Sequence, residues 1–373
     1  MKILFDTQIF NNQKFGGISR YFTEIITGIK LKGHQAIPKK IFADNLPLRQ
    51  NALSKLDLFT QTRYFRGKAR INNLIEKYQE NDIASKVKGG NYDIFHPTYY
   101  DPRFLDYKPK NKPFVLTVHD MIHELQLDNL FGCEHKETTG KKILIPEADH
   151  IIAVSQSTKQ DILTLFPSVP EDKITVIHHG NPLENIQPAA TNTFNPDYFL
   201  YVGMRNSYKN FNWLIKAISG YLIENELHLI CAGGYPFSAE ELKLIELLKL
   251  KGKIHFAGIE CDSDLCALYK NAKCLIIPSL YEGFGMPILE AFSCDCPVLA
   301  NASSSLPEIA GPAAIYFDAK EQDTILRGLD EIQQKDIRDR KLTAGKDQLK
   351  KFSWEKSVDQ HIEVYRRLLN KTP

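Results

Sequence analysis

Residues 278–292 read PSLYEGFGMPILEAF, in which Glu282 and Glu290 stand eight positions apart with two glycines and a proline between them. The apolar run just before them, LIIP, predicts a buried strand, and the glycines predict a turn at its end. Pro287 suits the first position of a new helix, where no backbone N–H needs a partner. A strand, a glycine turn and a helix in this order are typical of an α/β domain, whose ligands bind at the carboxyl ends of the strands.

The same alternation of apolar strands and amphipathic helices runs along the chain. Strands are expected at 2–6, 94–96, 114–117, 150–154 and 174–177, and again at 199–202, 227–231, 253–256, 274–278 and 297–300. Helices are expected at 19–29, 212–218, 239–250 and 264–270, and around 159–165, where Ser157 would be the cap. This order predicts parallel sheets covered by helices on both faces.

With 373 residues, the chain is too long for one ordinary core and suits two domains. The polar, proline-containing segment 183–197 interrupts the alternation and predicts the boundary. We therefore expect an N-terminal domain at 1–188 and a C-terminal domain at 189–352, both doubly wound and facing one another across a cleft. Apolar residues at helical spacing in 353–369 predict a terminal helix.

Composition limits the class of protein. A content of 43% hydrophobic and 25% charged residues is typical of a soluble globular protein, and no tract is long enough to span a bilayer. The first residues predict a strand rather than a secretory signal. Seven cysteines, an odd number in mostly apolar surroundings, favour reduced thiols in a cytosolic protein. The formal charge of +2 implies no general affinity for nucleic acid.

Residues 46–80 interrupt the alternation with a basic stretch in which leucine, phenylalanine and tyrosine are interleaved. Such a stretch suits an anionic membrane surface. It equally suits the solvated face of a helix, and the sequence leaves both interpretations open.

The chemistry of the 282–290 stretch points to a phosphorylated ligand. Gly283 and Gly285 would let the backbone approach a ligand, and the helix that follows would favour a phosphate at its N-terminus. Glu282 and Glu290 could accept hydrogen bonds from hydroxyl groups on two sides, as a nucleotide sugar would require. The alternative is that Glu282 caps the helix and Glu290 is a surface acid, and the spacing alone does not decide between the two.

The stretch resembles the Glu-x7-Glu signature of retaining glycosyltransferases with the two-domain GT-B fold, in glycosyltransferase family 4 (the "glycosyl transferases group 1" family). Residues 148–162, 174–182, 198–218 and 299–318 also resemble elements of that family. FGGISRYFTEI at 15–25, HPTYYDP at 96–102 and TVHDMIHEL at 117–125 resemble members that build bacterial surface polysaccharides, including mannosyltransferases. The resemblance covers nearly the whole chain and implies that the terminal segment, 353–373, crosses back to the N-terminal domain.

The resemblance also implies roles for residues of the C-terminal half. Glu282 would contact the hydroxyls of the donor sugar, and Glu290 would bind the ribose of the nucleotide. The backbone of Phe284, Gly285 and Met286 would hold sugar and phosphate.

Arg205 and Lys209 match the basic pair that neutralises the diphosphate in the family. Independently of the family, a leaving nucleoside diphosphate gains negative charge that fixed cations would stabilise. Met204 stands between Gly203 and Arg205, where many members have arginine directly after the glycine.

In the N-terminal half, the family's glycine loop matches Gly16 and Gly17, which would touch the sugar or diphosphate; an ordinary tight turn is the alternative. The pair is not a dinucleotide fingerprint, because the third glycine is missing. His119 follows the strand FVLTV and would contact the donor sugar near the reacting carbon, although a lone histidine is more often structural. His96 would line the acceptor side.

The family's chemistry implies retention of anomeric configuration by front-face displacement, in which the departing phosphate helps to deprotonate the acceptor hydroxyl. No carboxylate pair of the glycosidase type can be assigned. Asp262 and Asp264 resemble a metal-binding Asp-x-Asp motif, but they precede a helix and are expected to cap it. We therefore expect neither a metal nor a cofactor.

The expected function is transfer of a hexose, mannose from GDP-mannose, to a saccharide acceptor in bacterial surface polysaccharide (lipopolysaccharide O-antigen) synthesis. The acceptor would be lipid-linked, and the enzyme would work in the cytoplasm at the inner face of the membrane. A UDP-sugar donor, another enzyme of this fold such as an epimerase or phosphorylase, and a non-catalytic nucleotide-sugar-binding protein are the alternatives.

Overall fold

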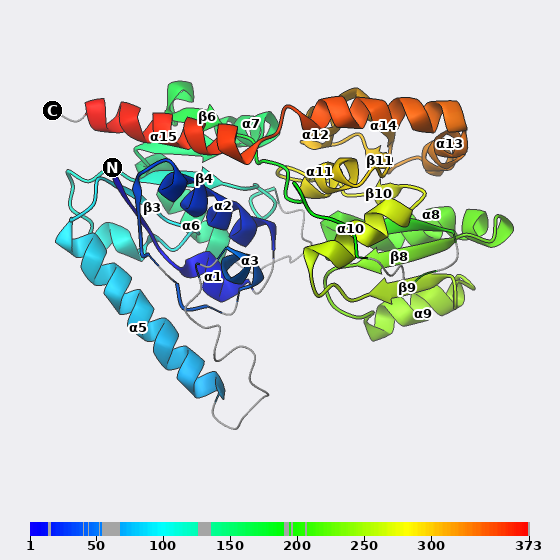
Figure 1. The fold of residues 1–373 in the computed structure, drawn as a ribbon, viewed down its shortest axis with the longest axis horizontal. Helices are drawn as coiled ribbons and strands as arrows, with labels where there is room; N and C mark the ends of the chain where they lie inside the picture. Colours follow the sequence, from blue (N-terminus) through cyan, green and yellow to red (C-terminus); the bar gives the residue numbers. More distant parts are fainter. Residues whose placement is uncertain are drawn as a thin grey trace. The chain divides into compact units, whose positions relative to one another are not determined.

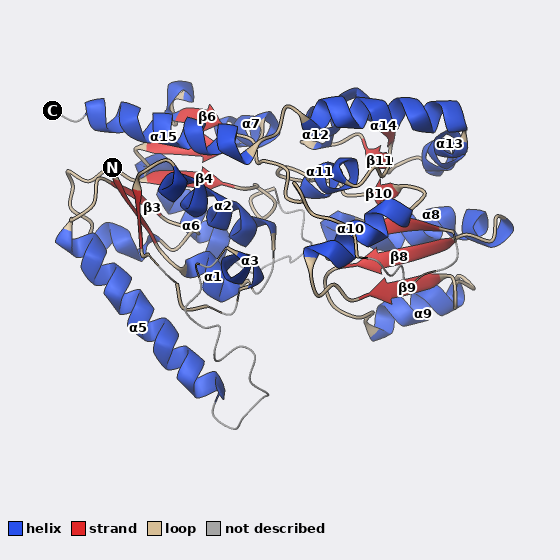
Figure 2. Cartoon of the chain, viewed as in Figure 1, coloured by secondary structure: helices blue, strands red, loops and turns tan. Residues whose placement is uncertain are grey.

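The computed structural model describes residues 1–13, 16–39, 41–43, 45–51, 53, 68–125, 136–189, 194, 197–205 and 207–371 of the chain. The chain divides into two compact units. Unit 1 consists of Met1–Glu124, Gly132–Gly180 and Ser353–Pro373, and unit 2 consists of Leu125–Phe131 and Asn181–Phe352. Each unit contains a sheet of parallel strands with helices on both faces (Figure 2).

The sheet of unit 1 is built from two sets of three parallel strands. The first set has the order β2-β1-β3 and the second has the order β4-β5-β6. A parallel bridge between Phe95 and Phe114 joins β3 to β4. The strands are β1 Lys2–Phe5, β2 Gln35–Ile37, β3 Ile94–His96, β4 Val115–Val118, β5 His150–Ala153 and β6 Ile174–Val176. The chain leaves β1 toward one edge and continues from β3 toward the other, so the topological switch point lies between β1 and β3.

Side chains of successive strand residues point to opposite faces of this sheet, and each face has its own core. Ile3 and Phe5 pack with α2 (Gly17–Leu31) and with α15 (Trp354–Lys371), the terminal helix (Figure 1). Leu4 packs on the opposite face. The helices of that face are α5 (Lys68–Gly89), α6 (Lys136–Glu147) and α7 (Gln156–Leu165).

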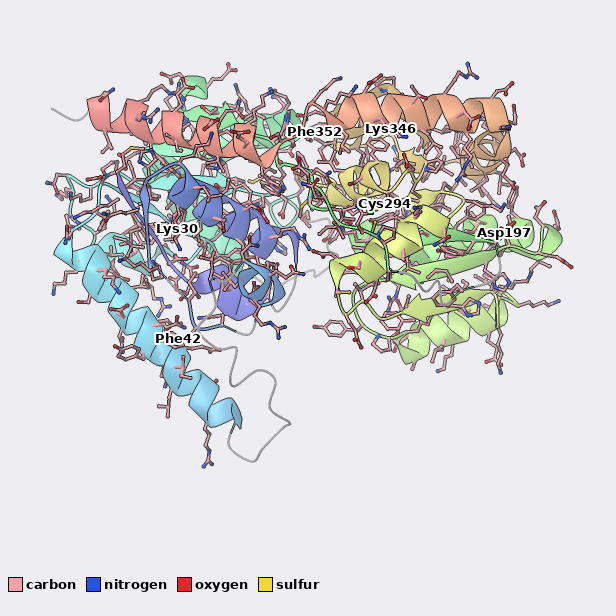
Figure 3. The ribbon with its side chains drawn as sticks, in the orientation of Figure 1. Lys30, Phe42, Asp197, Cys294, Lys346 and Phe352 are labelled. Carbon is pink, nitrogen blue, oxygen red and sulfur yellow. The ribbon has the colours of Figure 1, made fainter. Side chains whose placement is uncertain are left out.

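Short elements complete unit 1. They are α1 Gln8–Asn12, α3 Leu46–Gln50 and the 3-10 turns Pro102–Asp106 and Glu171–Lys173. The Gln79 side chain of α5 accepts from the Phe42 amide at 2.8 Å and donates to the Phe42 carbonyl at 2.6 Å, which fixes α5 beside segment 41–43 (Figure 3).

Unit 2 has one six-stranded parallel sheet of order β12-β11-β10-β7-β8-β9. Its strands are β7 Tyr198–Val202, β8 His228–Ala232, β9 Ile254–Ala257, β10 Leu275–Ile277, β11 Val298–Asn301 and β12 Ala314–Phe317. Read from the β9 edge, this is the doubly wound order 3-2-1-4-5-6. The switch point therefore lies between β7 and β10, which pair directly.

Helices cover both faces of the unit 2 sheet. One face carries α8 Phe211–Glu224, α9 Ala239–Leu247 and α13 Gln322–Gln333, whose apolar side chains share one core with β7, β8 and β9. The remaining helices are α10 Asp262–Asn271, α11 Met286–Ser293, α12 Leu306–Ala310 and α14 Lys335–Leu349, and short 3-10 turns lie at Ser207–Lys209 and Gly311–Ala313.

All ten expected strands are present, with ends that differ by one residue at most from the expectation. Two further strands, β2 and β12, were not expected. The cap of α7 is Ser155 rather than Ser157, because Ser155 is the last extended residue and its hydroxyl accepts from the Thr158 amide at 3.0 Å. Pro287 is the second residue of α11 rather than the first.

Candidate active site

Two loops meet at the switch point of unit 2. The loop after β7 carries Arg205 and Lys209, and the loop after β10 carries Glu282. Because β7 and β10 are adjacent parallel strands, their carboxyl ends lie side by side. The Leu280 amide donates to the Tyr208 carbonyl at 2.8 Å, which ties the two loops together.

Lys209 and Glu282 form an ion pair across these loops. Lys209 Nζ lies 2.7 Å from Glu282 Oε1, and the side chains are 18% and 13% exposed. The Ser279 hydroxyl donates to the same carboxylate oxygen at 2.7 Å. Among the described residues, no hydrogen-bond donor reaches the second oxygen, Oε2, so that oxygen can accept from a ligand hydroxyl.

The turn between β10 and α11 requires glycine at position 285. Gly285 has φ +100, and a Cβ there would lie 3.0 Å from a methyl carbon of Leu306. Gly285 is also the residue before the first turn of α11, and no side chain caps that helix. The alternative that Glu282 caps α11 is therefore wrong.

Glu290 lies one turn inside α11, where its Oε2 accepts from the Tyr269 hydroxyl at 2.7 Å. Tyr269 belongs to α10 and is fully buried. Burial, together with the negative charge of Glu290, raises the pKa of Tyr269 well above its ordinary value, so the hydroxyl remains a donor. The interpretation of Glu290 as a solvated surface acid does not hold, and no sequence motif pointed to Tyr269.

Arg205 lies in different surroundings from Lys209. Its Nε donates to Glu241 Oε1 at 2.7 Å, and its side chain is 6% exposed. The guanidinium carbon lies 4.8 Å from the centre of the Phe237 ring. Nη1 is buried and has no hydrogen-bond partner among the described residues. The structure thus holds Arg205 against the start of α9 and Lys209 against Glu282.

In unit 1, His119 follows β4 and is buried. Its ring centre lies 5.1 Å from that of Tyr21 and 5.8 Å from that of Phe22, both in α2. Neither ring nitrogen has a hydrogen-bond partner among the described residues. Burial lowers the pKa of His119 to about 3, so the imidazole is neutral near pH 7 and can exchange hydrogen bonds with a ligand without carrying charge.

A buried lysine that the sequence did not single out fixes the loop after His119. Lys141 of α6 is 1% exposed, and its Nζ donates to the Asp120 carbonyl at 2.8 Å and lies 3.0 Å from Glu124 Oε2. Burial alone would raise the pKa of Asp120, but Lys141 and the Ile122 amide hold it below its ordinary value. Nothing in the amphipathic pattern of α6 distinguishes this lysine from a solvated one.

The glycine pair begins α2. Gly16 precedes the helix with an extended backbone, and Gly17 is its first residue. The Ser19 hydroxyl donates to the Gly16 carbonyl at 3.0 Å, and the Gln13 side chain accepts from the Ser19 amide at 3.3 Å. These contacts fix Gly16 at the start of α2.

His96 does not line an acceptor site. It is fully buried, with one ring nitrogen 2.7 Å from the Tyr365 hydroxyl and the other 2.9 Å from the Thr117 hydroxyl. The expectation for His96 is therefore wrong, because the terminal helix α15 supplies a partner that cannot be identified from the local sequence.

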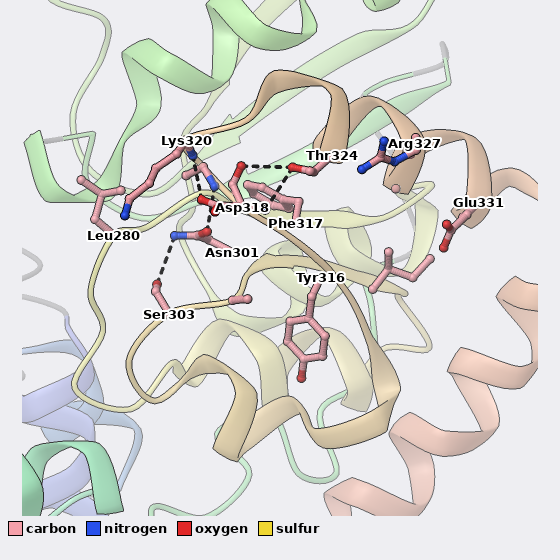
Figure 4. A pocket seen from close by; sticks show the side chains of 14 residues that line it. Leu280, Asn301, Ser303, Tyr316, Phe317, Asp318, Lys320, Thr324, Arg327 and Glu331 are labelled. Carbon is pink, nitrogen blue, oxygen red and sulfur yellow. Dashed lines mark hydrogen bonds between the residues drawn. The ribbon is translucent and has the colours of Figure 1, made fainter.

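The two units each contain a cavity of ligand size. A cavity of about 700 Å³ in unit 1 lies where residues after β1 meet residues after β3, at the switch point of that sheet. Its lining is polar and aromatic and includes Asn11, Asn12, Tyr99 and Glu137. A cavity of about 730 Å³ in unit 2 lies at the carboxyl ends of β11 and β12, near the edge of the sheet, and is lined in part by Lys320 (Figure 4).

Of the two acids expected to cap α10, Asp264 makes the capping contacts, whereas Asp262 is the first residue of the helix. The Asp264 carboxylate accepts from the Cys261 amide at 3.2 Å and from the Glu260 amide at 3.3 Å. Across the described part of the chain, no three histidine, cysteine or acidic side chains gather as a metal site would require. Nor does any described helix combine the length and the apolar character of a bilayer span.

Comparison with known proteins identifies the family. The model of Glycosyltransferase Family 4 matches residues 15–185, and that of Glycosyl transferases group 1 matches residues 184–349. O-antigen chain mannosyltransferase B of Escherichia coli is 27% identical over 99% of this chain and 100% of its own. Serotype-specific mannosyltransferase WbdA of Escherichia coli is 30% identical over 68% of this chain and 33% of its own.

The crystal structure of Anabaena HepE in complex with UDP-glucose has a TM-score of 0.72 at 17% identity and covers 98% of this chain and 100% of its own. At that identity the likeness shows the fold alone, which is GT-B. The two family models together span residues 15–349, and the protein therefore belongs to the family 4 glycosyltransferases with a group 1 domain in its second half.

Proposed function

We propose that the protein is a retaining, metal-independent mannosyltransferase that transfers mannose from GDP-mannose to a saccharide acceptor in bacterial surface polysaccharide synthesis. The observation that carries the proposal is the Lys209–Glu282 pair at the unit 2 switch point, beside the start of α11. The choice of mannose is supported by the names of the relatives, which are O-antigen and serotype-specific mannosyltransferases.

In the proposed donor complex, the diphosphate binds between Lys209 and the start of α11, where the positive end of the helix dipole favours an anion. Glu282 Oε2 accepts from the sugar hydroxyls, and the backbone of Phe284, Gly285 and Met286 follows the sugar and phosphate. Glu290 binds the ribose, with Tyr269 holding one of its oxygens. Arg205 adds a second cation through Nη1, its remaining donor.

The proposed reaction breaks the bond between the sugar carbon C1 and the oxygen of the diphosphate. That oxygen gains negative charge, which Lys209 and the start of α11 stabilise. The acceptor hydroxyl attacks C1 from the same face, and its proton passes to the leaving phosphate oxygen. His119, neutral and with neither ring nitrogen bonded to a described residue, exchanges hydrogen bonds with the donor sugar, and the turn at Gly16 and Gly17 follows the sugar or diphosphate.

We further propose that the acceptor saccharide binds the 700 Å³ cavity of unit 1. Amide and carboxylate groups such as those of Asn11, Asn12 and Glu137 suit sugar hydroxyls, and tyrosine rings such as that of Tyr99 suit the apolar face of a sugar. The cavity lies at the switch point of its sheet, where doubly wound folds bind ligands.

The acceptor in this proposal is lipid-linked, and the enzyme works at the cytoplasmic face of the membrane. Along α5, Arg70, Leu74, Lys77 and Tyr78 share one side of the helix and are exposed, Leu74 to 68% and Tyr78 to 70%. Cations beside exposed apolar groups favour an anionic lipid surface. Replacing Leu74 and Tyr78 by Ser should reduce sedimentation with phosphatidylglycerol vesicles, and unchanged sedimentation would contradict this part.

A UDP-sugar donor is the second candidate, because HepE, which shares the fold, was crystallised with UDP-glucose. A panel of GDP-mannose, UDP-glucose, UDP-galactose and UDP-N-acetylglucosamine, with release of nucleoside diphosphate as the signal, decides between the donors. GDP release from GDP-mannose supports the proposal, UDP release supports the second candidate, and saturable binding without turnover supports a non-catalytic protein.

The stereochemical and metal parts of the proposal are tested with the same reaction. NMR of the product should show the anomeric configuration of the donor, and an inverted product would contradict the retaining mechanism. Dialysis against a chelator should leave turnover unchanged. Loss of turnover that returns with a divalent cation would contradict the metal-independent mechanism.

A further inference from the structure

Ser304 follows β11 in a backbone conformation that serine rarely adopts. Its φ is +45, in the left-handed region that favours glycine. The other described non-glycine residues with positive φ are Asn185, Asn210, Glu226, Lys249 and Asp295. Of these six described residues, Ser304 is the one whose side chain forms hydrogen bonds with the backbone of Glu282. A glycine would adopt this conformation without strain, so the conformation alone does not explain a serine.

The hydroxyl of Ser304 closes a small ring with the backbone of Glu282. It accepts from the Glu282 amide at 2.8 Å and donates to the Glu282 carbonyl at 3.0 Å. Ser305, which is fully buried, contributes a hydroxyl 2.8 Å from the same carbonyl and 2.8 Å from that of Phe284. The loop after β11 thus fixes both peptide groups of Glu282 at the end of β10.

The side chain of Glu282 has contacts of its own in addition to those of its backbone. Lys209 and Ser279 both contact Oε1, which leaves Oε2 for the ligand. The direction of Oε2 then depends on where the Glu282 backbone stands. A shift of a few tenths of an ångström there changes every hydrogen bond that this carboxylate makes with a sugar hydroxyl.

We infer that Ser304 is a positioning residue for Glu282. The strained backbone of Ser304 is retained because its hydroxyl holds the Glu282 peptide in the geometry that donor-sugar recognition needs. The inference rests on the proposed function, since it assigns Glu282 to the donor sugar. Ser304 itself contacts the backbone of Glu282 and acts through it. Its effect should therefore appear in turnover of the intact donor and not in affinity for the nucleotide.

The test compares Ser304→Gly with the parent and with Glu226→Gly. Glu226 is exposed, has φ +55 and lies in the turn between α8 and β8, so its replacement relieves the same kind of strain away from the loop. Glu226→Gly should have a Tm equal to or above that of the parent, and Ser304→Gly, which relieves the strain but loses the hydroxyl, should have a Tm above that of Ser304→Ala. Ser304→Gly should lower kcat/KM for the sugar donor about tenfold, and Glu226→Gly should leave it unchanged.

Two further measurements separate positioning from stability. The Kd of GDP, the nucleotide without its sugar, should stay within about twofold of the parent in Ser304→Gly, because the nucleotide contacts of Glu290 are intact. Ser304→Ala, which keeps the strain and loses the hydroxyl, should lower Tm and kcat/KM together.

Ser304→Gly with a kcat/KM within twofold of the parent overturns the inference while leaving the proposed function intact. An equal loss of GDP affinity and of turnover also overturns it, since that result indicates general damage to the loop. A parent protein that turns over no nucleotide sugar overturns the proposed function, and the inference with it.

Discussion

The two cations after β7 should respond differently to removal. Lys209→Ala removes an ion pair whose side chains are 18% and 13% exposed, but the Ser279 hydroxyl still donates to Glu282, so the free energy of unfolding should fall less than in Arg205→Ala. Turnover should fall about 10²–10³-fold at saturating donor, because the leaving diphosphate loses a positioned cation. Lys209→Arg, which keeps the charge, is the matched control, and turnover of Lys209→Ala within a few-fold of the parent would refute the role.

Arg205→Ala should instead cost stability. Its guanidinium is buried against Phe237, and its removal leaves the Glu241 carboxylate without its cation. The free energy of unfolding should fall by roughly 3–5 kcal/mol, as for other broken buried pairs. Urea denaturation measures the difference, and a fall no larger than that of Lys209→Ala would contradict the structural role of Arg205.

The sequence indicated Glu282, Glu290 and Lys209 because they belong to short motifs that follow two apolar strands, β10 and β7. It gave no sign of Tyr269 beside Glu290 or of the Ser304 hydroxyl beside Glu282, since both partners come from other elements and neither belongs to a charge or glycine pattern. The ion pair of Arg205 with Glu241 was equally hidden, because Arg205 lies in the loop after β7 and Glu241 in the first turn of α9. The roles of these residues toward a donor stay predictions.

Helix α6 is fixed to the loop after β4 by one buried ammonium group. Lys141→Met should leave Glu124 and Asp120 without their cation and lower the free energy of unfolding by roughly 3–5 kcal/mol. Lys142→Met, at the neighbouring exposed position, is the control and should change it little. Denaturation curves of equal midpoint for the two variants would show that the buried triad contributes nothing.

The strands were predictable because parallel strands covered on both faces are short apolar runs. Strand β2 escaped prediction, since it has only the residues Gln35–Ile37 and begins with an exposed glutamine. The start of α7 was misplaced because a serine stands at each of positions 155 and 157, and only the backbone conformation distinguishes the cap. The helix at the end of the chain matched its 3.6-residue pattern, and α15 runs from Trp354 to Lys371.

Four buried histidines of unit 1 make the free energy of unfolding depend on pH. Burial lowers the pKa of His119 to about 3 and that of His361 to about 4, and it holds those of His96 and His179 well below the ordinary value. The unfolded chain therefore binds more protons below about pH 6.5, and the free energy of unfolding falls as the pH falls from there toward 4. The limiting contribution of one such histidine is about 1.4 kcal/mol per pH unit.

One carboxyl opposes this trend. Burial raises the pKa of Asp6 to about 6, so the folded chain takes up a proton there before the unfolded chain does. The net fall between pH 6.5 and 5 should still be several kcal/mol by urea denaturation, and His361→Gln should show a smaller fall. A free energy of unfolding that is constant over this range would contradict the neutral histidine core.

The chain as a whole was predictable in its class and in its doubly wound sheets, because strand and helix periods alternate over nearly all of its length. The donor base, the acceptor and the membrane contact could not be read in the same way. Doubly wound folds bind their ligands with loop side chains, which follow no period, and the basic segment 46–80 falls partly outside the described residues. Those assignments stay predictions.

Isothermal titration of GDP-mannose into the intact protein tests whether a sugar diphosphate binds at the loops after β7 and β10. We expect one site per chain, binding weakened at least about tenfold by Lys209→Ala, and no change in Lys320→Ala, which alters the cavity at the carboxyl ends of β11 and β12. Binding that is lost in Lys320→Ala and retained in Lys209→Ala would show that the sugar diphosphate binds in that cavity instead.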